Sequence, residues 1–261
     1  MKIYISADIE GISSISTWQE SDMAAPKEAR DRMTQEVKAA CEAAFQAGAT
    51  EVMVKDAHGY GKNIRHEDLP VGVQLINGWS NHPYNMVEGI DETYDGVIFL
   101  GYHSGASTHF SPLAHTLDTN VAKIKVNGEI SSEFSIYSTL TQILGIPILT
   151  VTGDGGIIRE VMEFDPMIET VAVKEGFAGA MISNHPKVVY EQIKDSVKKG
   201  IEKIGEYNFV YPSSYNMEVT FVRHKDAYKY SFYPGVEQID ANTVRLKTEN
   251  YFEILSFLVF I

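Results

Sequence analysis

Two acidic residues near the start of the sequence have the type and spacing of metal ligands. They belong to the motif Asp8-Ile9-Glu10-Gly11, which follows a short segment rich in Ile and Tyr. Side chains two residues apart in an extended strand point to the same side, so the two carboxylates lie together if the strand continues. Two like charges held together require a compensating cation. Gly11 lets the backbone turn close to the two carboxylates. The motif therefore predicts a metal site.

Histidines follow two other predicted strands in a similar way. His58 belongs to Asp56-Ala57-His58-Gly59, and His103 belongs to Gly101-Tyr102-His103-Ser104. Because open α/β sheets bind ligands at the carboxyl ends of their strands, we expect these imidazoles to join Asp8 and Glu10 at one edge. Histidine together with carboxylate suits Zn²⁺, and Mn²⁺ or Fe²⁺ also fit. Such ions activate water for attack on amides or esters, which predicts a metal-dependent hydrolase.

Other ligands that are common on α/β folds fit this sequence poorly. A dinucleotide site would require Gly-x-Gly-x-x-Gly after the first strand, where Asp8 and Glu10 would repel a pyrophosphate instead. The segment Gly153-Asp154-Gly155-Gly156 is rich in glycine but lacks the lysine of a phosphate-binding loop. We interpret it as a tight turn from a strand into a helix.

Composition and charge exclude several classes of protein. The 261 residues carry a formal net charge of −13, which argues against a nucleic-acid binder and against docking to an anionic membrane. A single cysteine, Cys41, excludes a disulfide-built fold and is expected to be a small core residue. Residues 1–8 are too short for a secretion signal, and no segment approaches the roughly 18 apolar residues of a membrane span. We expect a cytoplasmic protein.

Hydrophobic periodicity places the candidate ligands on a β-α-β framework. The expected elements are strands over residues 2–8, 51–56, 71–76, 95–101 and 146–152, and helices over 26–46 and 132–144. Residues 121–126 followed by Asn127-Gly128 predict a hairpin, because Asn-Gly favours a two-residue turn. Strands that alternate with helices are typical of an open, mostly parallel α/β sheet with flanking helices.

The residues after 156 show a different pattern. The expected elements are helices over 157–163 and 186–204, strands over 169–174 and 216–223, a further strand within 236–246, and a helix from about residue 250. Strict alternation over 216–223 predicts a strand with one solvent-exposed face. We therefore divide the chain into an α/β metal-binding domain over residues 1–156 and a smaller α+β domain over residues 157–261.

Several of these segments together resemble the DppA-type zinc-dependent D-aminopeptidase family. Ser6-Ala7-Asp8-Ile9-Glu10-Gly11 matches that family's Ser-x-Asp-x-Glu-Gly signature. Lys55-Asp56-Ala57-His58 and Leu100-Gly101-Tyr102-His103 resemble its second and third metal segments, and residues 127–133 resemble the segment with its last carboxylate. Pro234-Gly235-Val236 resembles a late family motif, and the similarity extends over essentially the whole chain.

The resemblance implies a centre of two zinc ions in each subunit. Asp8 would bridge both ions. Glu10 and His58 would complete one site, and His103 and Glu133 would complete the other. From the sequence alone, Glu133 on a predicted helix would be a solvated surface residue. The resemblance implies instead that it is a metal ligand.

Two positions need a choice between neighbours. His115 occupies the place of the family's catalytic histidine, and His109 lies six residues before it. The family usually has a Gly-Glu pair where this chain has Ser132-Glu133, so Glu129 is an alternative last ligand.

The resemblance also implies a reaction and an assembly. The substrates would be short peptides or amides with an N-terminal D-amino acid, attacked by metal-bound water, with His115 as proton donor or oxyanion stabiliser. Glu10, Asp56 and Asp154 are candidates for binding the substrate ammonium. The family forms a ring-shaped decamer around an internal channel, which implies a homo-oligomer.

Residue chemistry alone leaves two alternatives open. One is another di-metal amidohydrolase or a phosphoesterase, because two-metal sites serve both reactions. The other is a non-catalytic assembly protein that keeps the metal for stability.

Overall fold

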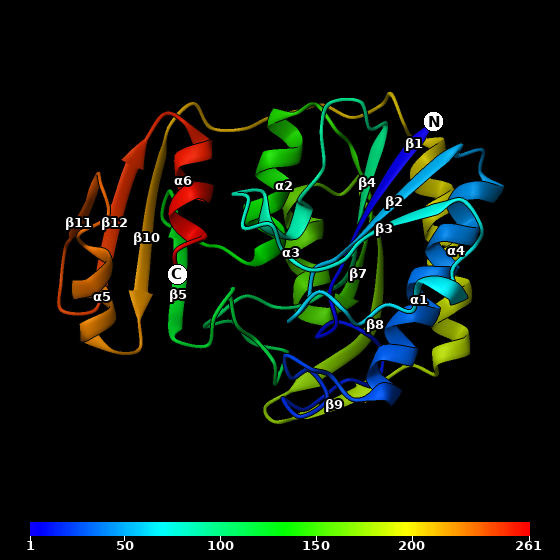
Figure 1. The fold of residues 1–261 in the computed structure, drawn as a ribbon, viewed down its shortest axis with the longest axis horizontal. Coiled ribbons are helices and arrows are strands. Elements are labelled where there is room, and N and C mark those ends of the chain that lie inside the picture. The colour runs from blue at the N-terminus through cyan, green and yellow to red at the C-terminus, as the bar shows by residue number, and fades with distance from the viewer.

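The computed structural model describes all 261 residues and contains two β-sheets surrounded by helices (Figure 1). The larger sheet has seven strands in the order β3-β2-β1-β4-β7-β8-β9. Every neighbouring pair is parallel except β8 and β9, which confirms the predicted mostly parallel sheet. Its strands are β1 (Lys2–Ala7), β2 (Glu51–Asp56), β3 (Val73–Ile76), β4 (Gly96–Tyr102), β7 (Ile148–Asp154), β8 (Glu169–Phe177) and β9 (Ala180–Ser183).

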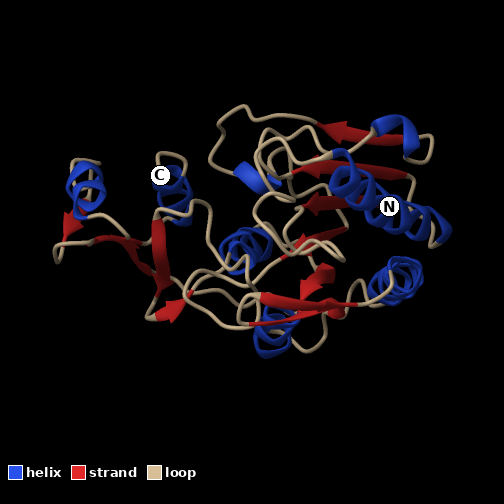
Figure 2. Ribbon diagram, turned by 90° about the horizontal axis from the view of Figure 1, so that it is seen from below, coloured by secondary structure: helices blue, strands red, loops and turns tan.

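Helices cover both faces of the larger sheet, because its central strands are apolar on both sides. Within β1, Ile3 and Ile5 belong to one hydrophobic core and Tyr4 to the other. The first core lies under α1 and α4, and the second lies under α2 and α3. Figure 2 shows helices on both sides of the larger sheet. These helices are α1 (Lys27–Gln46), α2 (Glu133–Ile143), α3 (Gly155–Phe164) and α4 (Pro186–Glu202). Cys41 is buried in the first core, as expected of a small core residue.

The smaller sheet has five antiparallel strands in the order β11-β12-β10-β5-β6. The predicted hairpin is confirmed: Asn127 and Gly128 join β5 to β6 with φ values of 53° and 94°. Two helices, α5 (His224–Tyr230) and α6 (Tyr251–Leu258), accompany this sheet. Its strands are β5 (Val121–Val126), β6 (Glu129–Ile130), β10 (Tyr215–Phe221), β11 (Val236–Gln238) and β12 (Thr243–Thr248).

The two sheets alternate along the chain. β5 and β6 precede residue 156 but belong to the smaller sheet, whereas β8 and β9 follow it and belong to the larger one. The core that contains Tyr4 also contains Val219 of β10 and Ile254 of α6, so it continues from the larger sheet into the smaller one. The sheets therefore do not divide at residue 156, and the division into domains 1–156 and 157–261 stays a prediction.

Some elements differ from the expectation. The region 236–246 contains two strands, β11 and β12, because Asp240 accepts the backbone N–H groups of Asn242 and Thr243 and turns the chain between them. The hydrophobic pattern does not predict β9 or α5, since both are short. Short 3₁₀ turns occupy His66–Asp68 and Asn85–Val87. None of the helices has the length and apolar character needed to cross a membrane.

The strand order creates a switch point beside β1. From β1 the chain continues to β2 and β3 on one side, and then returns to place β4 on the other side. The loops after β1 and β4 therefore diverge from adjacent strand ends. Ligands of open α/β sheets bind at such a point.

Candidate metal centre

Four predicted ligands converge at the carboxyl ends of β1, β2 and β4. Asp8 and His103 directly follow β1 and β4, and His58 lies two residues beyond β2. Asp8 and Glu10 are each 2% exposed, His58 is 8% exposed and His103 is 1% exposed. Burial of carboxylates without a compensating charge costs several kcal/mol per ion. The burial of this cluster therefore requires a positive charge.

Gly11 allows the loop after Asp8 to pass close to β4. A Cβ atom on Gly11 would lie 1.9 Å from the carbonyl oxygen of Tyr102. The Gly11 N–H donates to the carbonyl oxygen of Gly101 over 2.7 Å, which fixes the loop against the end of β4. Only a residue without a side chain fits this crossing, so the glycine of the motif has a structural cause.

Asp8 presents a different oxygen to each histidine. Its Oδ1 lies 3.4 Å from Nδ1 of His58, and its Oδ2 lies 3.3 Å from Nε2 of His103. A carboxylate whose two oxygens face two different ligand groups can bridge two adjacent ions.

Each histidine has a second carboxylate beside it. Oε2 of Glu10 lies 2.9 Å from Nδ1 of His58, and Oε2 of Glu133 lies 3.2 Å from Nε2 of His103. We call the first group the Glu10–His58 site and the second the His103–Glu133 site, with Asp8 shared between them. The structure thus brings together all five residues that the resemblance implied.

The proton positions of the two histidines show why these groups suit a metal ion. Nε2 of His58 donates to the carbonyl oxygen of Asp22 over 3.3 Å, and Nδ1 of His103 donates to that of Ser104 over 3.0 Å. A carbonyl oxygen only accepts, so in the neutral ring the other nitrogen carries a lone pair. That nitrogen faces carboxylates in both cases. A lone pair that faces an anion requires either a proton on the ring or a metal ion between the two groups.

The spacing of the facing atoms also fits zinc. Oδ2 of Asp8, Oε2 of Glu10 and Nε2 of His103 are buried and make no hydrogen bond, although ion-pair partners lie within 3.3 Å of each. Ligands at about 2.0–2.1 Å from a tetrahedral zinc ion are about 3.3 Å from one another. Atoms at this separation without hydrogen-bond geometry are arranged around a common point.

The carboxylates and imidazoles shift one another's pKa values. Burial alone lowers the pKa of His58 and His103, but Glu10 and Glu133 respectively, together with Asp8, raise both pKa values well above the usual range. Burial and the charge of Asp8 raise the pKa of Glu10. Burial opposes ionisation of Asp8, yet the two histidines hold its pKa below the usual range. The negative field that favours imidazolium here also favours a divalent cation.

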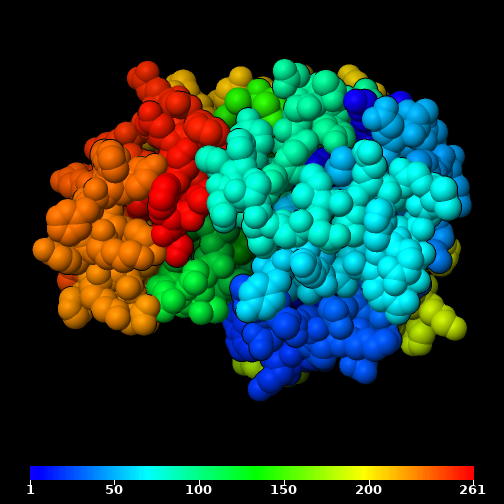
Figure 3. Space-filling view, viewed as in Figure 1, coloured from blue at the N-terminus to red at the C-terminus, as the bar shows by residue number.

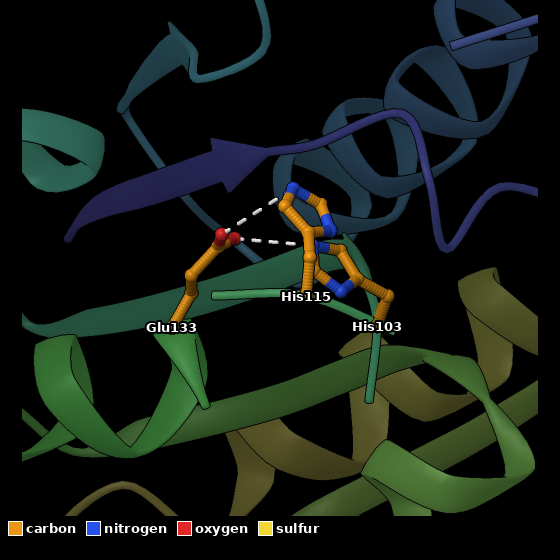
Figure 4. Close-up of side chains that lie close together, drawn as sticks. All are labelled: His103, His115 and Glu133. Atoms are coloured by element: carbon orange, nitrogen blue, oxygen red, sulfur yellow. Dashed lines mark ion pairs between the residues drawn. The ribbon is translucent and has the colours of Figure 1, made fainter. Parts of the chain in front are cut away.

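His115 lies beside His103 and Glu133, and the ligand atoms of the three residues are within 4.8 Å of one another, close enough to share an ion. Its ring stacks on that of His103 with centroids 4.3 Å apart, and its Nε2 lies 3.9 Å from Oε1 of Glu133 (Figure 4). Nδ1 of His115 donates to the carbonyl oxygen of Leu113 over 2.9 Å, so Nε2 is the free position. The indole of Trp18 packs edge-on against the ring at 5.2 Å. This Nε2 is placed to exchange a proton with a bound substrate.

The structure distinguishes the neighbouring alternatives by position. Glu133, the first residue of α2, is 4% exposed and lies in the cluster, whereas Glu129 is exposed on β6. His109 is also exposed, and His115 is not. The Leu117 N–H donates to Oε1 of Glu133 over 2.7 Å, which leaves Oε2 free to face His103.

Two acids proposed to bind the substrate ammonium have other partners. Asp56 accepts hydrogen bonds from the backbone N–H groups of Asn63 and Ile64. Asp154 caps α3 and accepts the N–H and O–H of Ser104, next to His103. These carboxylates therefore hold the ligand-bearing loops. Asp154 also confirms that residues 153–156 form a strand-to-helix turn.

A cavity of about 560 Å³ opens over the cluster. Asp8, Glu10, His58, His115 and Glu133 form part of its wall. The rest of the wall includes residues of the loop after β1 and of the C-terminal segment, namely Trp18, Ser21, Asp22, Met23, Leu258, Val259 and Ile261. In Figure 3 the C-terminal residues, in red, lie opposite the blue and cyan surface of the larger sheet's loops. The cavity is large enough for a short peptide.

Comparison with known proteins identifies the family of this chain. The sequence pattern of the family described as D-aminopeptidase matches residues 1–260. The chain belongs to the D-aminopeptidase family. A D-aminopeptidase of Bacillus subtilis (strain 168) is 35% identical over 177 residues, which are 67% of this chain and 64% of that protein. The matched segment thus spans less than two thirds of that relative.

A solved structure extends the similarity over the whole chain. It is the Zn-dependent D-aminopeptidase DppA from Bacillus subtilis, described as a self-compartmentalizing protease. The two structures superpose with a TM-score of 0.92 and 27% sequence identity, covering 100% of this chain and 95% of that one. The α/β fold with its additional antiparallel sheet is therefore the fold of this family.

Proposed function

We propose that this chain is a zinc-dependent D-aminopeptidase with two metal ions in each subunit. The observation that carries the proposal is the orientation of the Asp8 carboxylate, whose two oxygens face His58 and His103 separately. Membership of the D-aminopeptidase family supports the reaction, and the zinc dependence of the similar solved structure supports the metal. Mn²⁺ and Fe²⁺ accept the same ligand types.

In this proposal five residues hold the ions and one residue acts on the substrate. Asp8 would be shared between the ions, Glu10 and His58 would hold one ion, and His103 and Glu133 would hold the other. When bound, zinc lowers the pKa of a coordinated water to about 7 and polarises a substrate carbonyl. The orientation of Glu133 is fixed by the Leu117 N–H.

His115 moves the proton that peptide cleavage requires. Its Nδ1–H is held by the Leu113 carbonyl group, so Nε2 is the atom that gains and gives the proton. Protonated at Nε2, it donates to the leaving amine as the amide bond breaks, and it steadies the oxyanion before that. The stacking of its ring on His103 and the edge contact of Trp18 fix the ring plane. No ligand role for His115 is needed in this arrangement.

The cavity supports a short substrate with a free amino terminus. Asp22 and Asp118 line the wall, and each accepts a backbone hydrogen bond at Oδ1 only, so Oδ2 is available to an ammonium group. Met86 and Leu117 provide apolar surface for a small side chain. These features suit short peptides or amides, and membership of the D-aminopeptidase family supports an N-terminal D-amino acid.

The assembly and the location are part of the same proposal. The similar solved structure is described as a self-compartmentalizing protease, which supports a homo-oligomer for this chain. Large exposed apolar side chains, including Phe232 and Phe260, are available for subunit contacts. A decameric ring and a cytoplasmic location stay predictions from the sequence.

Matched substrates test the proposed function. The zinc-loaded protein should hydrolyse D-alanyl amide at least about ten times faster than L-alanyl amide, because a pocket that discriminates by shape gives roughly that factor or more. N-acetylation of the D-substrate should abolish the reaction. Chelation should remove the activity, and added zinc should restore it. Equal rates on both stereoisomers, or hydrolysis of a phosphate ester only, would identify another di-metal hydrolase. Full zinc content without any hydrolysis would identify a metal-stabilised assembly protein.

A further inference from the structure

Lys174 is a buried lysine that contacts the loop of the metal motif. It lies on β8, is 2% exposed, and belongs to no motif that the sequence suggested. Its ammonium group donates to three backbone carbonyl groups: that of Glu10, that of Ile12 over 3.0 Å and that of Ile15 over 2.6 Å. A lysine ammonium has three N–H donors and no acceptor, so all of its donors are used.

These three carbonyl groups belong to the loop between β1 and α1, which Glu36 and Ser183 also hold by hydrogen bonds to its N–H groups. After Asp8 the chain leaves β1, crosses β4 at Gly11 and forms no regular element before α1. Unpaired buried carbonyl groups cost free energy, and one charged donor that binds three of them makes stronger bonds than neutral partners would. Lys174 therefore fixes the path of the loop from Glu10 to Ile15.

The loop carries functional groups at both ends. At its start the Glu10 carboxylate lies 2.9 Å from Nδ1 of His58, while the Glu10 carbonyl group accepts the Lys174 ammonium. Beyond Ile15 the chain reaches Trp18, whose indole packs against His115. A shift of the backbone at Glu10 would move its carboxylate away from His58, since both groups belong to one residue.

The other metal site has different supports. Ser104 and the start of α2 hold His103 and Glu133, and they are bound by Asp154 and by Glu160 through Ser132. Lys174 makes no hydrogen bond to these groups. The hydrogen bonds that hold the two sites are therefore different, although Lys174 on β8 lies beside Asp154 on β7.

We propose that Lys174 is a positioning residue that sets the affinity of the Glu10–His58 site through the backbone of Glu10. This inference rests on the proposed two-metal function, and it assigns Lys174, which is not a metal ligand, an effect on one of the two sites. Loss of the ammonium group weakens that site, and it leaves the His103–Glu133 site loaded. Substitution of groups that orient metal ligands typically weakens metal binding about 10–100-fold.

Zinc titration of Lys174→Met tests the proposal. Methionine keeps an unbranched apolar chain but removes the three donors. The variant should bind one zinc ion with the wild-type affinity and the other about 10–100-fold more weakly. At limiting zinc kcat should fall, and at saturating zinc KM should stay near the wild-type value. Two wild-type affinities, or equal weakening of both, would overturn the proposal.

Glu36→Gln is the matched control, because Glu36 supports the same loop from α1. Its Oε1 accepts the N–H and O–H of Ser13, and glutamine keeps an oxygen for them. This variant should bind both zinc ions as the wild type does. The same selective weakening in Glu36→Gln would show that any change near the loop suffices, which contradicts a specific role for Lys174.

Lys174→Arg covers the case in which the methionine variant fails to fold. Arginine keeps a cation with N–H donors but holds them in a planar fork that does not match three converging carbonyl groups. Its zinc affinity should therefore fall at one site only and by less than 100-fold. An arginine variant that loses affinity equally at both sites contradicts the selective role. A wild-type protein that binds no zinc would instead overturn the proposed function itself.

Discussion

The rings of His103 and His115 lie face to face, with centroids 4.3 Å apart and 4° between their planes. His103 turns Nε2 toward Asp8, whereas Nε2 of His115 is 3.9 Å from Glu133, and His115 lines the cavity. In the proposed mechanism, the stack therefore joins a metal ligand, His103, to the proton donor, His115. Each role has its own measurable consequence.

Replacement of His115 should reduce the rate without loss of metal. In His115→Ala the proton donor is absent, so kcat should fall about 10²–10⁴-fold. The zinc content measured by elemental analysis should equal that of the wild type. Loss of one zinc ion in this variant would mean that His115 is a ligand of the His103–Glu133 site.

Replacement of Asp8, the proposed bridging ligand, should empty both sites. Asp8→Ala removes the oxygens that face His58 and His103, so zinc content and activity should both be lost. Glu133→Gln should lose one ion, and Glu129→Gln, at an exposed glutamate four residues earlier, should lose none. A metal-free Glu129→Gln protein, or an active and fully loaded Asp8→Ala protein, would contradict the ligand set.

Zinc binding should release protons and become tighter as pH rises. The neighbouring carboxylates raise the pKa values of His58 and His103 well above the usual range, so both imidazoles are protonated in the metal-free protein at neutral pH. Zinc binds the neutral ring and displaces those protons. Titration calorimetry at about pH 6 and about pH 8, in buffers of different ionisation enthalpy, measures this release. Binding without proton release at both pH values would contradict the expected protonation.

Glu36 should make the protein less stable as pH rises through neutrality. Burial raises the pKa of Glu36 to about 7 although Ser13 donates two hydrogen bonds to it. The folded state therefore keeps a proton that the unfolded state loses above about pH 4.5. The contribution of Glu36 is complete below that pH and is lost as pH rises through about 7, a change of about 3 kcal/mol.

Glu36→Gln removes this titration and tests it. The free energy of unfolding of the variant, relative to the wild type at the same zinc concentration, should increase by up to about 3 kcal/mol between about pH 5 and about pH 8. Urea unfolding at several pH values gives this difference. A difference that stays constant with pH would show that Glu36 has an ordinary pKa.

Much of the site is predictable because its residues follow strands. Asp8, His58 and His103 follow buried strands, and parallel strands deliver their carboxyl ends to one edge. That rule alone is enough to expect the three side chains side by side. Glu133 and His115 give no such signal, since one begins a helix and the other lies in a loop. Only the resemblance to a known family identifies them.

Other features depend on tertiary contacts that leave no local pattern. Lys174 contacts Glu10 from 164 residues away, and its neighbours in sequence resemble those of any buried strand. The smaller sheet combines β5 and β6 with strands that begin at Tyr215 or later. A domain boundary placed at residue 156 from the local sequence pattern therefore does not separate the two sheets. The α/β class is nevertheless predictable, because it depends on the alternation of strands and helices.

The metal content of the wild-type protein tests the two-metal centre most directly. The purified protein is saturated with zinc, dialysed against zinc-free buffer and subjected to elemental analysis. Two sites that share Asp8 predict two zinc ions per chain, and aminopeptidase activity that reaches its maximum at that ratio. One zinc ion per chain at full activity, or none, would contradict the centre described here.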